Sequence, residues 1–65
     1  MTPFQRYLVT LDSPDGKWEI EVGSSQGPDA AGRRAHVSLV HNMHGRDSRY
    51  DLDTVHVKAV EEIAT

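Results

Sequence analysis

The sequence predicts a small α+β domain, in which an antiparallel β-sheet of three to four strands carries one C-terminal helix on one face. Two stretches, residues 17–22 and 35–43, alternate polar and apolar side chains with a period of two, as half-buried strands do. After residue 53 the apolar residues change to a helical period. With 65 residues and no internal repeat, the chain is expected to form a single domain.

The N-terminal part of the chain has the pattern of a β-hairpin. Residues 17–22 read Lys-Trp-Glu-Ile-Glu-Val, and residues 4–11 are rich in aromatic and β-branched side chains. Residues 13–16 between them, Ser-Pro-Asp-Gly, are typical of a turn, because proline presets φ and glycine accepts a positive φ. We therefore expect two antiparallel strands joined by this turn.

Hydrophobic patterning also predicts the register of this hairpin. Pairing Asp12 with Lys17 places six apolar side chains on one face, whereas a slip by one residue turns half of them to water. The predicted inward set is Tyr7, Val9, Leu11, Trp18, Ile20 and Val22. Val9 should then lie opposite Ile20, with both side chains directed at the helix.

The middle of the chain is expected to contain a loop and a third strand. Residues 23–33 include three glycines and one proline without periodicity, which predicts a flexible loop. Residues 35–43 alternate again, and in a strand their apolar face would include Val37.

The last third of the chain predicts a short fourth strand and the helix. Residues 49–52 should form the strand, with Tyr50 and Leu52 inward. Asp53 is a suitable N-cap for a helix over about residues 54–64. The apolar arc of that helix would contain Val55, His56, Ala59, Val60, Ile63 and Ala64.

Charge is distributed unevenly along the chain, whose net charge is −3. Four arginines and one aspartate give residues 33–50 a charge of +3, while the segments before and after each carry −3. Such a basic block can bind an acidic partner or a nucleic acid, or it can be balanced by acidic neighbours in the fold. The candidate basic patch consists of Arg33, Arg34, His36, His44, Arg46 and Arg49.

The residues that carry most enzyme chemistry are sparse. The chain has no cysteine, which excludes disulfides and thiolate ligands, and it lacks the phosphate-loop and nucleophile motifs of common enzymes. His41, His44 and Asp47 have a spacing that could chelate a metal ion, but side chains around a turn are more often simply solvated. The sequence therefore predicts a non-catalytic protein without a metal site or cofactor.

Localisation follows from the same composition. No apolar run approaches the roughly 18 residues that a membrane span needs, and the first residues lack the apolar core of a signal peptide. Together with the absence of cysteine, this predicts a cytoplasmic protein without membrane contact.

Three apolar side chains, Phe4, Leu8 and Val40, are left for the second face of the sheet once the helix-facing side is filled. On a domain this small, such a patch favours a protein contact. The predicted function is a small regulatory protein that binds a protein partner or itself, as a homodimer. A nucleic-acid-binding regulator that uses the basic block at residues 33–49 is the alternative.

Overall fold

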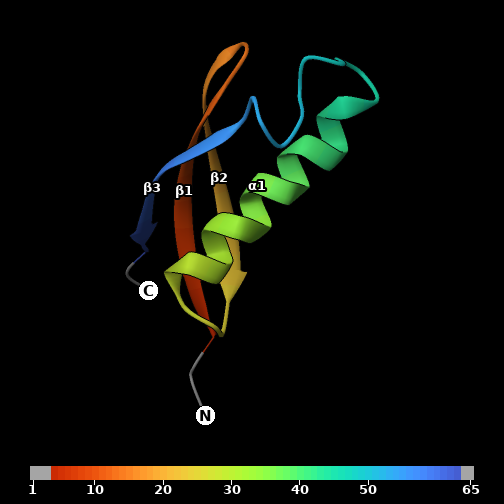
Figure 1. The fold of residues 1–65 in the computed structure, drawn as a ribbon. Coiled ribbons are helices and arrows are strands. Elements are labelled where there is room, and N and C mark those ends of the chain that lie inside the picture. Colours follow the sequence, from red (N-terminus) through yellow and green to blue (C-terminus); the bar gives the residue numbers. More distant parts are fainter. Residues whose placement is uncertain (1–3, 64–65) are drawn as a thin grey trace.

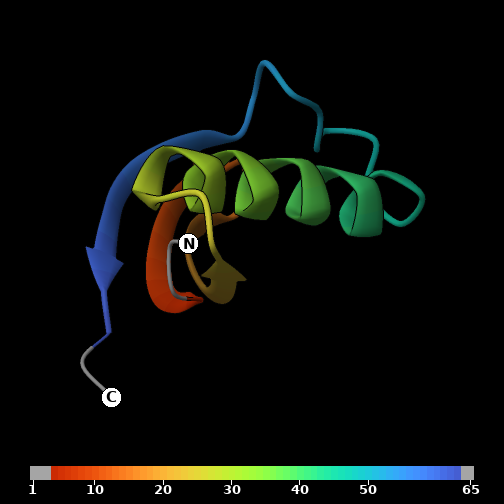
Figure 2. The same ribbon diagram turned by 90° about the horizontal axis from the view of Figure 1, so that it is seen from below.

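The computed structural model describes residues 4–63 and has the element order ββαβ (Figure 1). The strands are β1 (Gln5–Ser13), β2 (Gly16–Ser24) and β3 (His56–Glu62), and the helix is α1 (Pro28–His44). The sheet is antiparallel with the strand order β2-β1-β3, and α1 lies across one face of it (Figure 2). A small α+β fold with an antiparallel sheet and one helix is therefore confirmed, but the helix lies between the second and third strands of the sequence.

The β1–β2 hairpin has the predicted register. Val9 lies opposite Ile20, and Asp12 lies opposite Lys17. Val9 and Leu11 are fully buried under α1, which agrees with the inward face expected from the alternation. The pattern is decisive here because a shift by one residue would move these side chains to the solvated face.

The turn of the hairpin uses the residue types expected of it. Ser13 pairs with Gly16, so only Pro14 and Asp15 lie in the turn itself. The Ser13 hydroxyl donates to the carbonyl of Gly16 at 2.8 Å and accepts from the backbone N–H of Asp15 at 3.2 Å. Gly16 has a φ of 115°, a conformation that a residue with a side chain rarely adopts.

The first correction concerns α1, which replaces the predicted strand at 35–43 and most of the predicted loop at 23–33. Ala31, Ala35 and Leu39 recur every four residues, and all three are buried. Ala35 and Leu39 also fit an alternating pattern, so two periods compete, and the unbroken run of 17 residues is long for a strand. Only three residues remain between β2 and α1.

The second correction concerns the C-terminal segment, which forms β3 instead of a helix. β3 pairs with β1, with Val60 opposite Val9 and Val57 opposite Leu11. A register shift between Thr10 and Leu11 is a β-bulge, and it brings both Val57 and Val60 to the side of α1. Two inward residues that are three positions apart imitate a helical period, which explains the wrong prediction.

Close packing of α1 on β3 depends on Gly32. A Cβ atom at this position would lie 3.2 Å from Cγ2 of Val60 and 3.6 Å from Cγ1 of Val57. Glycine therefore lets the helix approach the strand more closely than a larger residue would. His56, predicted on the apolar arc of a helix, is exposed at the start of β3.

Residues 45–55 form an irregular loop between α1 and β3, where a fourth strand was predicted. Tyr50 is fully buried, as expected, but Leu52 is 56% exposed. The side chain of Tyr50 thus belongs to the core, whereas that of Leu52 faces outward. The core cluster consists of Val9, Leu11, Ala35, Leu39, Tyr50 and Val55.

A hydrogen-bond network ties this loop to the tip of the hairpin. The Tyr50 hydroxyl accepts from Nε1 of Trp18 at 3.1 Å and donates to Oδ2 of Asp15 at 2.9 Å. The Ser13 hydroxyl is 3.2 Å from the hydroxyl oxygen of Tyr50, and Nη2 of Arg49 is 2.5 Å from Oδ1 of Asp15. We call these five residues the Tyr50 clamp. It fixes the course of the loop, and with it the position of Leu52.

Candidate functional site

The predicted partner surface is not assembled. Leu8 lies in β1 and Phe4 directly precedes that strand. Val40 lies on α1 and packs against the core. A strand over residues 35–43 would place Val40 on the second face of the sheet, whereas in α1 it packs against the core between the helix and the sheet. Phe4 is 69% exposed, and its ring covers Gly23 of the neighbouring strand.

The sheet face turned away from α1 is charged instead of apolar. Leu8 lies between Glu21 of β2 and Glu61 of β3 in the register of the sheet. Arg6 forms an ion pair with Glu21, and Nζ of Lys58 is 3.2 Å from Oδ2 of Asp12. Leu8 is therefore flanked by a glutamate on each neighbouring strand, and this face does not bring Phe4, Leu8 and Val40 together.

The predicted basic patch is divided as well. The first half of α1 contains Arg33 and Arg34, and His36 lies at its middle. His44 is its last residue, about 16 Å along the helix axis from Arg33. Arg46 and Arg49 follow in the loop. The six residues thus occupy two separate regions of the molecule.

Arg49 is neutralised by the fold. Its Nη2 atom lies 2.6 Å from Oδ2 of Asp47 and 2.5 Å from Oδ1 of Asp15. The hydrogen bonds that Arg49 donates to Asp47, and next those to Asp15, raise the pKa of its guanidinium above the ordinary value. The hydrogen bonds that the Arg49 side chain and backbone donate lower the pKa of Asp47. Arg49 consequently serves the structure of the loop and is a poor candidate for binding an external anion.

The histidines do not gather around a common point. Nδ1 of His44 is 2.8 Å from the carbonyl oxygen of Tyr50, while His41 is exposed on α1. Nε2 of His36 is buried without a hydrogen-bond partner among the described residues. Within residues 4–63, no three histidine or carboxylate side chains are placed to hold a metal ion. His44 and Asp47 of the sequence-derived triplet already have other partners.

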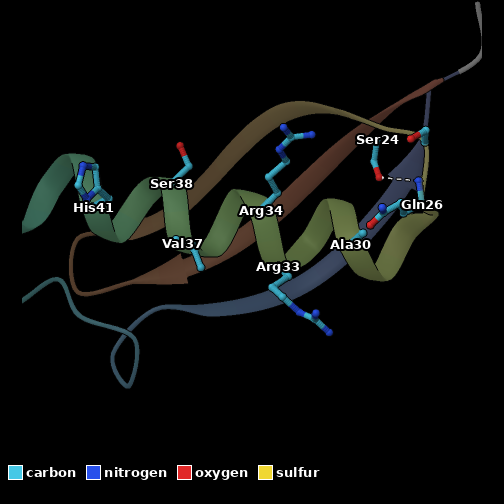
Figure 3. A pocket seen from close by; sticks show the side chains of 9 residues that line it. Ser24, Gln26, Ala30, Arg33, Arg34, Val37, Ser38 and His41 are labelled. Atoms are coloured by element: carbon cyan, nitrogen blue, oxygen red, sulfur yellow. Dashed lines mark hydrogen bonds between the residues drawn. The ribbon is translucent and has the colours of Figure 1, made fainter.

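A surface that sequence reasoning missed lies on the outer side of α1. Groove 1, of about 670 Å³, runs between α1 and the residues that follow β2 (Figure 3). Arg34 stands at its edge, where Nη1 donates to the carbonyl of Gly23 at 3.0 Å. Figure 3 shows Arg33 and Arg34 extending from α1 in different directions. The lining residues are Ser24, Ser25, Gln26, Ala30, Arg33, Arg34, Val37, Ser38 and His41.

Groove 2, of about 430 Å³, continues this surface toward the C-terminal end of α1. Val37 and His41 line both grooves, and Leu52 of the loop forms the far wall of groove 2. Val37 is 52% exposed. The lining residues are Val37, Val40, His41, His44, Gly45 and Leu52. We call the residues that line the two grooves the α1 surface.

The α1 surface combines exposed apolar side chains with positive charge. None of its lining residues in the described part of the chain is acidic, and Arg33 has no ion-pair partner there. Sequence patterning missed it because Val37 was placed on the inner face of a strand. In a helix, Val37 lies about 200° around the axis from the buried Ala35 and therefore on the outer side. A predicted helix would therefore have exposed Val37, but it would not have placed Leu52 beside it.

Comparison with family models, curated proteins and solved structures finds no match for the chain. The hydrogen bonds of the described residues join no serine or threonine hydroxyl to a histidine. No helix in the described range is long and apolar enough to cross a membrane. The chemistry that the α1 surface supports is the binding of carboxylates and apolar groups by side chains.

Proposed function

We propose that this chain is a protein-interaction module, which binds an acidic and partly apolar segment of a protein partner at the α1 surface. One observation carries the proposal: Val37 is exposed in the same groove as Arg33 and Arg34, Leu52 is exposed in the adjoining groove, and no acidic residue lines either groove. Exposed apolar residues that share a groove are a common feature of protein contacts. Arginine adds selectivity, because its planar group matches a carboxylate in two hydrogen bonds.

The local charge of the α1 surface favours an acidic partner over a second copy. Two copies that met through their α1 surfaces would bring Arg33 and Arg34 close to His41 and to each other, with no carboxylate between them. The self-association expected through Phe4, Leu8 and Val40 has lost its basis, because these residues do not form one patch. A homodimer is therefore an outcome that the test must detect.

A protein segment also fits better than a nucleic acid. Three of the six residues that line groove 2 are aliphatic, and aliphatic side chains gain little from a phosphate backbone. The basic block on which the nucleic-acid alternative depended is divided, and Arg49 is paired with two aspartates. The net charge of −3 would further weaken binding to a polyanion.

The proposal is tested with a labelled synthetic peptide whose helical face carries leucine and glutamate, by fluorescence anisotropy at an ionic strength of about 0.15 M. Val37→Asp and Arg33→Glu should each weaken binding about tenfold or more, because each removes a central contact. Phe4→Asp and Lys17→Glu are the matched controls at exposed positions away from the α1 surface, and they should leave the affinity within about twofold. Circular dichroism confirms that each variant is folded.

Three results would contradict the proposal. Equal losses in the variants and their controls would mean that binding is unspecific. Tighter, steeply salt-dependent binding of a duplex DNA would favour the nucleic-acid alternative. A dimeric mass of the free chain in light scattering, abolished by Val37→Asp, would show that the α1 surface serves self-association.

A further inference from the structure

We infer that the segment bound at the α1 surface is itself an α-helix, antiparallel to α1, with an apolar anchor in groove 2 and a carboxylate two turns later facing Arg33 and Arg34. This inference rests on the proposed function and specifies the partner. Three features of the α1 surface carry it: the groups it offers, the spacing between its two grooves, and the direction of α1.

The groups that α1 offers to a partner are side chains, not backbone. The backbone N–H and C=O groups of α1 are engaged within the helix, apart from those at its ends. An extended segment placed along α1 would leave its own backbone groups without partners at the contact. A helix satisfies them internally and presents only side chains, as partners in helix-in-groove recognition do. The occupant of this surface is therefore helical.

The spacing between the grooves sets the pattern of the bound helix. Val40 and His41 line groove 2, and Arg33 and Arg34 stand seven residues earlier in groove 1. Seven residues of helix span about 10 Å, which is two turns. A partner helix that runs alongside α1 therefore presents an apolar residue i to groove 2 and a carboxylate at i+7 to the arginines. A small residue near i+4 would lie over Val37, which both grooves share.

The direction follows from electrostatics. The N-terminal end of a helix carries partial positive charge and the C-terminal end partial negative charge, so two neighbouring helices are favoured in antiparallel orientation. The arginines lie in the first half of α1, so in this orientation the carboxylate follows the anchor in the partner sequence. Asp29 is exposed in the first turn of α1, and it would repel a second carboxylate at about i+11.

Groove 2 is suited to hold a defined anchor because its far wall is fixed. Leu52 belongs to the loop that the Tyr50 clamp ties to the hairpin. The Thr54 hydroxyl donates to the carbonyl of Arg49 at 2.6 Å, and the N–H of Val55 donates to the carbonyl of Asp51 at 3.2 Å. These bonds hold the loop on both sides of Leu52, so the groove is preformed for an aliphatic side chain.

The test compares three labelled helical peptides of identical composition. The forward peptide has leucine at i and glutamate at i+7, the reversed peptide exchanges these two residues, and the displaced peptide has its glutamate at i+9, on the opposite face. The forward peptide should bind about tenfold more tightly than the displaced one and severalfold more tightly than the reversed one. Arg33→Glu should remove the preference for the forward peptide, and Leu52→Ala should weaken its binding.

A fourth peptide, the forward sequence with a central proline, tests for the helix, because proline interrupts helical structure. It should bind at least about tenfold more weakly than the forward peptide. Equal affinities of all four peptides, each still sensitive to Val37→Asp, would overturn the helical register and leave the proposed function intact. Failure of every peptide to bind would overturn both. Circular dichroism of the peptides ensures that the three helical ones have the same helix content.

Discussion

The two ends of the molecule are held together by different kinds of contact. At the hairpin tip, Tyr50 is fully buried and its ring meets that of Trp18 edge to face, with the centroids 6.3 Å apart. Near the start of α1, Gly32 allows the helix to approach Val57 and Val60 of β3 directly. Figure 1 shows the tip and the 45–55 loop at one end of the molecule and the start of α1 at the other. The first end should be sensitive to truncation, and the second to enlargement.

This difference also divides the proposed binding surface. Groove 2 includes Leu52 and depends on the loop at the clamped end. Groove 1 contains Arg33 and Arg34, which lie next to Gly32 at the closely packed end. A substitution at one end should therefore disturb the groove at that end more than the other groove. Measuring both the stability and the peptide binding of each variant tests this division.

The largest effect is expected from Tyr50→Ala, which removes a buried ring at the clamped end. Truncation of a buried aromatic residue typically costs about 3–5 kcal/mol, a large share of the stability of so small a domain. We expect the variant to be largely unfolded at 25 °C in circular dichroism. Urea denaturation gives the stability of the parent chain as the reference. A variant that unfolds at nearly the parent urea concentration would contradict the importance of the ring.

Gly32→Leu should have the next largest effect and probes the closely packed end. Its side chain has no room beside Val60, so α1 and β3 must separate, at a cost of about 1–3 kcal/mol. Gly32→Ala is the control: its Cβ needs only a small shift of Val60, and alanine favours the helix by about 1 kcal/mol over glycine. Urea midpoints should therefore fall for leucine and change little for alanine. Equal losses in both would mean that backbone conformation, not space, requires the glycine.

Tyr50→Phe separates the ring from its hydroxyl. The ring contact with Trp18 is kept, but Nε1 of Trp18 and Oδ2 of Asp15 lose their shared partner. We expect a loss of about 1–2 kcal/mol in urea denaturation, smaller than that of Tyr50→Ala. The fluorescence of Trp18, the only tryptophan, reports on this end directly. An unchanged midpoint would show that water replaces the hydroxyl without loss.

The smallest effect concerns Asp47 and pH. The pKa of Asp47 is lowered from its ordinary value of 3.8 by the hydrogen bonds from Arg49, so its contribution to stability is present above that value. The contribution is lost as the pH falls through the lowered pKa, that is, below about pH 4. Arg49→Ala should flatten this part of the stability profile, measured by urea midpoints between pH 2 and 5. An equally steep profile in Arg49→Ala would assign the acid sensitivity to other carboxylates.

Much of the fold is determined locally. The hairpin, its turn and its register follow from the alternation around Val9 and Ile20, because a shift by one residue exposes half of the apolar set. The basic character of Arg33 and Arg34 is also evident in the sequence, and so is the burial of Tyr50. At these positions the sequence fits only one structural interpretation.

Other features depend on contacts that no local pattern contains. Ala35 and Leu39 fit both a strand and a helix, and burial of Ala31 one turn earlier distinguishes the two. Val57 and Val60 are three positions apart yet face the same way, because a bulge in the pairing with β1 shifts the alternation. Because these two segments form the structures opposite to those predicted, Val40 packs against the edge of the core from α1, and Val37 lies on the surface. The chain by itself therefore determined the hairpin and the class of fold, while strand pairing and helix burial decided which residues face a partner.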